Sequence, residues 1–106
     1  MVNAARGEVA LELGGRAYCL CLTMGALAEI ETALGAKDLN DMDARLKAVR
    51  AEDLVQILHA LMKGGGESLS LEETRALPLN VMATTAAIGQ AFQAAGVRAE
   101  QPQAQS

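Results

Sequence analysis

Two cysteines and one histidine are the residues with the clearest chemistry of their own in this chain. Cys19 and Cys21 are two apart, so on a strand both side chains point to one side, where two thiolates could share a metal ion. A tetrahedral zinc site needs two more ligands, and His59 lies far along the chain with no other cysteine available. We therefore predict free thiols, with no metal, no cofactor and no nucleophile paired to His59. A disulfide between the cysteines is disfavoured because their Cα atoms would be about 6.5–7 Å apart.

The carboxylates also fail to match a catalytic or calcium-binding pattern. Asp38 begins an acidic run, but the sixth residue is Asp43 where a calcium loop needs glycine, and the twelfth is Val49 where it needs glutamate. Glu29 and Glu31 are two apart on a predicted helix and diverge by about 200°, which rules against a shared acid–base site. The sequence thus predicts a protein that is not an enzyme and has no catalytic residues.

Charge and hydropathy limit the classes of partner. A net charge of −4 argues against sequence-independent nucleic-acid binding, which needs a basic surface. Arg45, Lys47 and Arg50 cluster around the end of a predicted helix, so a small DNA-binding regulator is retained as a weaker alternative. No apolar run approaches the roughly 20 residues that span a bilayer, and the first residues lack the apolar core of a signal peptide. We predict a cytoplasmic protein without a membrane partner.

The stretch from Gly7 to Gly35 organises the predicted fold. Strands at residues 8–13 and 16–22 flank the turn Gly14-Gly15, which can take positive φ at both positions. Pairing Leu13 with Arg16 places six large side chains on one face: Val9, Leu11, Leu13, Tyr18, Leu20 and Leu22. The opposite face, which we call the outer hairpin face, carries Glu8, Ala10, Glu12, Ala17, Cys19 and Cys21.

Helical periodicity fills the rest of the chain. The first helix begins at the N-cap Thr23 and ends at Gly35, and Asp38 caps a second helix over residues 39–48. A third helix, with an apolar stripe broad enough for two neighbours, ends in Gly64–Gly66, which we predict to be a flexible loop. Ser70 and Glu73 form a capping box for a short helix over residues 71–76.

The last helix runs from about residue 79 to Gly96. Its predicted stripe consists of Val81, Met82, Thr85, Ile88 and Phe92, and Gly89 predicts a close helix contact. The predicted fold is α+β: a two-stranded N-terminal hairpin packed on a small bundle of about five helices. Residues 7–96 form a single domain in this prediction, and the polar tail 97–106 is disordered.

Two surfaces are candidates for partner binding. A two-stranded hairpin has outer edges with unpaired N–H and C=O groups, and this one also exposes small side chains at Ala10, Ala17, Cys19 and Cys21. Such a surface could accept another strand or a second copy of the chain, or it could be covered or simply solvated. The second candidate carries Leu71, Leu77 and Leu79, which exceed what one short helix can bury.

The string LTMGALAEIE at residues 22–31, with Gly7-Glu8 before it and Gly15 in the turn, resembles the opening signature of a known family. This family comprises small gene transfer agent and phage tail proteins of α-proteobacteria, grouped with tail assembly chaperones and sometimes labelled phage tail tube proteins. The resemblance covers about residues 7–95. One departure is CLC at residues 19–21, where the family has charged or polar residues on the outer face.

The resemblance implies a non-enzymatic role in building a tail. One possibility is a chaperone that covers apolar stripes on the tail tube or tape measure protein; the other is a structural tube component. A tube subunit is similar to a β-sandwich or barrel and needs many strands. Because only two strands are predicted here, we favour the chaperone, with the residues of the two candidate surfaces as its contacts.

Overall fold

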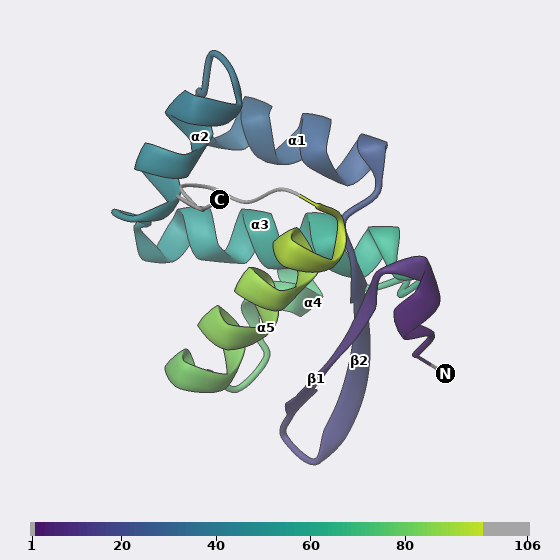
Figure 1. Cartoon of the computed structure of the whole chain (residues 1–106). Coiled ribbons are helices and arrows are strands. Elements are labelled where there is room, and N and C mark those ends of the chain that lie inside the picture. Colours follow the sequence, from purple (N-terminus) through teal and green to yellow (C-terminus); the bar gives the residue numbers. More distant parts are fainter. Residues whose placement is uncertain (1, 97–106) are drawn as a thin grey trace.

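The hairpin forms as predicted because two adjacent glycines reverse the chain. The computed structural model describes residues 2–96, in which β1 (Glu8–Leu13) and β2 (Arg16–Cys21) form a two-stranded antiparallel sheet (Figure 1). Gly14 and Gly15 have φ of 60° and 81°, and Leu13 pairs with Arg16 as the register requires. A short 3-10 turn, η1 (Ala4–Arg6), precedes β1. The tail predicted to be disordered, residues 97–106, lies outside the described residues.

Five α-helices follow the hairpin within the described residues, which confirms the α+β prediction. They are α1 (Met24–Leu34), α2 (Leu39–Leu46), α3 (Ala51–Gly64), α4 (Leu71–Arg75) and α5 (Val81–Ala94). The predicted caps are present: the Thr23 hydroxyl accepts from the Ala26 N–H, and Gly35 ends α1 with φ of 69°. Ser70 and Glu73 form the capping box of α4. None of these helices has the length and apolar character that crossing a membrane requires.

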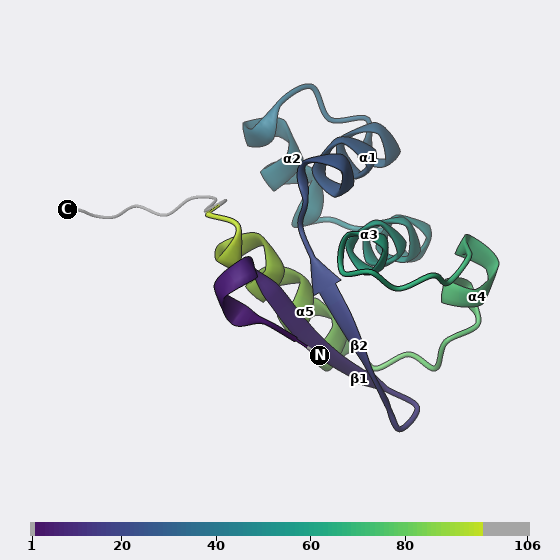
Figure 2. The ribbon, with the colours of Figure 1, turned by 90° about the vertical axis from the view of Figure 1, so that its right-hand side faces the viewer.

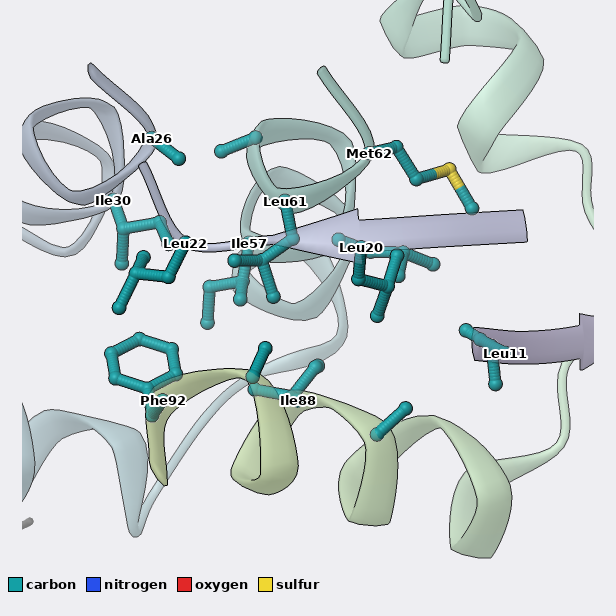
Figure 3. Packing of buried hydrophobic residues seen from close by; sticks show 14 of the residues in the cluster. Leu11, Leu20, Leu22, Ala26, Ile30, Ile57, Leu61, Met62, Ile88 and Phe92 are labelled. Carbon is teal, nitrogen blue, oxygen red and sulfur yellow. The ribbon is translucent and has the colours of Figure 1, made fainter. Parts of the chain in front are cut away.

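The core lies around α3, which packs against α1, β2, α4 and α5. Its broad apolar stripe is buried because neighbours cover it on several sides, as its width predicted. Figure 3 shows Ile57 and Leu61 of α3 pointing into the same space as Leu20 of β2 and Phe92 of α5. Ile57, Leu61 and Leu20 are fully shielded from solvent.

The predicted stripe of α5 is wrong in its first half. Val81, Met82 and Thr85 are exposed. The buried face instead carries Thr84, Ala87, Ile88, Ala91 and Phe92. Three of these residues are small, so the pattern of large side chains did not reveal the face on which α5 approaches β1. The prediction for Gly89 is also wrong, because Gly89 is exposed and a Cβ there would meet open space.

Two of the three glycines at the end of α3, Gly64 and Gly65, make a close backbone contact that the prediction of a flexible loop did not include. A Cβ on Gly64 would overlap the carbonyl oxygen of Cys21, and a Cβ on Gly65 would overlap that of Cys19. Glycine lets the end of α3 approach the backbone of β2 more closely than any other residue would. This contact fixes the hairpin against the helices.

Candidate functional site

The outer hairpin face is only partly open. Ala17 near the turn is exposed, and so is Ala10, which lies opposite Cys19 in the register, whereas Cys19 and Cys21 are half-buried. At the Cys21 end, the N-terminal turn folds over the strands: the Cys21 thiol lies 3.7 Å from the Arg6 carbonyl oxygen, to which it donates. The open part of the predicted surface therefore consists of the two alanines.

The outer edge of β2 is covered as well. The Cys19 N–H donates to the Glu67 carboxylate over 2.8 Å, and the Arg16 guanidinium lies 3.6 Å from the other oxygen of that carboxylate. Gly64 and Gly65 pack beside the same edge. The expectation of unpaired backbone groups is thus wrong at Cys19, and a third strand cannot add there without displacing Glu67.

The two cysteines are free thiols with different surroundings. The pKa of the Cys19 thiol is raised above its usual value of 9.0, mainly by burial and to a smaller extent by the nearby Glu8 carboxylate. The thiolate form of Cys19 is therefore disfavoured. Glu8 itself accepts a hydrogen bond from the Asn3 N–H over 2.7 Å. No group of three or more potential metal ligands exists among residues 2–96.

The other candidate residues have structural partners. The His59 Nε2 lies 3.1 Å from the Leu69 carbonyl oxygen and so ties α3 to the segment that follows it. Asp41 accepts hydrogen bonds from the Lys37 N–H and the Arg45 guanidinium. Both bonds lower the pKa of the Asp41 carboxyl, and the bond from the Lys37 backbone has the larger effect. The acidic run therefore organises the start of α2.

The connection between α4 and α5 passes the hairpin turn, with Pro78 beside Gly14 (Figure 2). The side chains around this connection form a groove. We call it the α4–α5 groove; its volume is about 170 Å³. Its wall is mostly apolar, with contributions from Leu13 of the hairpin, Leu54, Val55 and Leu58 of α3, and Leu77 and Leu79. Of the three leucines predicted here, Leu77 and Leu79 line the groove, whereas Leu71 is half-buried on α4.

Exposed apolar side chains occur in this groove and just after it in the chain. Leu79, which lines the groove, is 68% exposed, and Val81 and Met82 in the first turn of α5 are 55% and 81% exposed. Sequence reasoning missed the latter two because it placed them in the core. One local signal was available: Asn80 caps α5, its side chain accepting from the Ala83 N–H, which places Val81 and Met82 in the first helical turn.

One charged cluster lies at the rim of the groove. The guanidinium of Arg75, which lines the groove, pairs with Glu52 of α3 and lies 3.8 Å from Glu72 of α4. All three side chains are at least 39% exposed, so these pairs contribute little stability. Two carboxylates against one guanidinium make this part of the rim acidic.

These features are typical of a protein that binds another protein. The groove is smaller than the roughly 300–1,000 Å³ of ordinary small-ligand sites, and exposed apolar side chains beside a recess mark interaction surfaces. Residues 6–97 match the family model described as phage tail tube protein, GTA-gp10, and the chain belongs to this family. The resemblance to gene transfer agent and phage tail proteins is thereby confirmed. Neither a search among curated proteins nor one among solved structures found a match.

Proposed function

We propose that this member of a phage tail family is a tail assembly chaperone. It binds an apolar segment of the tail tube or tape measure protein at the α4–α5 groove and keeps that segment from aggregating until the tail polymerises. The observation that carries this proposal is the exposure of Leu79 in the lining of an apolar groove, together with the exposure of Val81 and Met82 in the helical turn that follows it. The protein acts in the bacterial cytoplasm, without a nucleic-acid or membrane partner.

The energetics of burial support this surface as the contact. Complete burial of a large apolar side chain contributes about 1.5–3 kcal/mol, so covering Leu79, Val81 and Met82 offers several kcal/mol toward binding. The ordering of both partners offsets part of this gain. A moderate affinity of this kind suits a helper that must release its client. The outer hairpin face, with Ala10 and Ala17 exposed and Cys19 and Cys21 half-buried, is the second surface that we propose for a client.

A structural tail tube component is the alternative function, and the description of the family supports it. In that case the partner is a second copy of the chain, and the protein forms homo-oligomeric rings. The two-stranded sheet of the described residues supports the chaperone, since a tube wall of the kind that the resemblance implies needs more strands.

Affinity capture separates the two functions. Tagged protein is purified from cells that produce particles, and the co-purifying proteins and the mature particles are both analysed by mass spectrometry. The chaperone proposal predicts that tube or tape measure protein is captured and that this chain is missing from mature particles. Stoichiometric amounts of the chain in mature particles would overturn it in favour of the tube component.

A further inference from the structure

A buried hydroxyl without a hydrogen-bond partner lies at the wall of the α4–α5 groove. Thr84 of α5 is 1% exposed, and its Oγ1 is the one buried side-chain oxygen or nitrogen within residues 2–96 that has no partner. Leaving such a group unpaired is costly, and buried polar atoms almost always find a partner. The residue therefore needs an explanation beyond packing.

The size and lining of the groove restrict what can enter it. Its volume of about 170 Å³ is close to that of a cavity of about 150 Å³ that is known to take up benzene. Leucine and valine side chains dominate the wall, which suits an aromatic ring. An occupant that also satisfies Thr84 must carry a polar atom at the tip of that ring.

We propose that the α4–α5 groove receives a tyrosine side chain from a different protein, with the Thr84 hydroxyl hydrogen-bonded to its phenol. This inference rests on the proposed function, in which that different protein is the tail client. A second copy of the chain cannot supply the ring, because the chain has no tryptophan and its only tyrosine and phenylalanine, Tyr18 and Phe92, are both 6% exposed.

The local structure provides what this contact requires. Threonine in a helix often bonds its hydroxyl to a carbonyl of the preceding turn, but the Thr84 hydroxyl makes no such bond, so it is free to rotate about the Cα–Cβ bond toward a ring in the groove. At the rim, Glu52 and Glu72 outnumber Arg75, which favours a client segment with a basic residue next to the tyrosine. Exposed Leu79 then covers the ring from the solvent side.

NMR titration of the methyl-labelled protein tests the inference with two probes. One is p-cresol, which is the side chain of tyrosine, and the other is toluene, which is the side chain of phenylalanine. We expect the methyl chemical shifts of Leu13, Leu58 and Leu79 to change as either probe is added. We also expect p-cresol to bind about threefold to tenfold more tightly than toluene, which is the gain that one net hydrogen bond provides. Thr84→Val should abolish this preference, while Thr84→Ser, which retains the hydroxyl, should keep it.

Each contrary outcome overturns the inference. These outcomes are shifts elsewhere in the protein, no binding of either probe, equal affinity for the two probes, or an unchanged preference in Thr84→Val. If Thr84→Val does not fold, the comparison of the two probes on the wild-type protein still decides. Capture of tail proteins from cells does not depend on a tyrosine, so that experiment can support the chaperone function while the titration refutes the tyrosine contact.

Discussion

Replacement of Gly65 by alanine should destabilise the protein sharply, although Gly65 has an ordinary backbone conformation. Its φ of −86° and ψ of 2° are open to alanine, so any effect must come from contact and not from backbone strain. A Cβ there would overlap the Cys19 carbonyl group, which is backbone and cannot rotate away. The end of α3 would therefore have to move away from β2.

The magnitude follows from two losses. Forcing an extra methyl group into a packed contact costs about 1–3 kcal/mol. Displacing the end of α3 also strains the hydrogen bond from the Cys19 N–H to Glu67, which contributes about 1 kcal/mol. We expect Gly65→Ala to lower the free energy of unfolding by about 3 kcal/mol and Tm by about 15 °C.

Urea unfolding followed by far-UV circular dichroism measures this change, and Gly89→Ala is the matched control. Gly89 lies within α5 with open space around it, so alanine there should raise the free energy of unfolding by about 1 kcal/mol. A Gly65→Ala variant within about 0.5 kcal/mol of the wild type would refute the close contact between α3 and β2.

Three further outcomes are expected at the residues around the hairpin and α2. Glu67→Ala should lower the free energy of unfolding by about 1–2 kcal/mol in urea titrations, because the Cys19 N–H loses its acceptor; no change would contradict the covered β2 edge. In a Cys21→Ser variant at pH 8, Cys19 should react with a disulfide reagent more slowly than in the urea-unfolded chain, because its raised pKa leaves less thiolate; equal rates would contradict this. Because the pKa of Asp41 is lower in the folded protein, its carboxylate stabilises the fold at pH values above the unfolded pKa of 3.8, and this stabilisation is lost as the pH falls through the folded pKa. Asp41→Asn should therefore flatten the acid limb of a plot of Tm against pH. An NMR titration that places the pKa of folded Asp41 at or above 3.8 would contradict this prediction.

Local signals in the sequence predicted the hairpin and most helix ends. The paired glycines at the turn fix the register, because a two-residue loop leaves one pairing that puts all the large residues on one face. Thr23, Asp38 and Ser70 cap their helices through hydrogen bonds within three residues, which depend little on the rest of the fold. Predictions of this kind succeed because their physical cause is local.

The errors arose where distant segments decide the outcome. Nothing near Gly64 and Gly65 in the sequence shows that their partner is the backbone of β2. The inward face of α5 carries alanines and Thr84, which allow close approach, while the larger Val81 and Met82 remain outside. The candidate groove was therefore only half predicted, through Leu77 and Leu79 and without α5.

Capture of tail proteins by surface variants tests the proposed function most directly. The double variant Leu79→Ser and Val81→Ser removes one exposed apolar side chain from the groove lining and another from the helical turn that follows it. Both side chains are more than half exposed, so the fold should persist. Met24→Ser is the matched control, since Met24 is 89% exposed on α1, away from the groove lining. We predict that the double variant, expressed in particle-producing cells, recovers at least tenfold less tube or tape measure protein than the wild type. A tenfold loss corresponds to about 1.4 kcal/mol of binding free energy. Met24→Ser should recover the wild-type amount. Equal recovery by all three proteins would contradict the assignment of the client site to the α4–α5 groove.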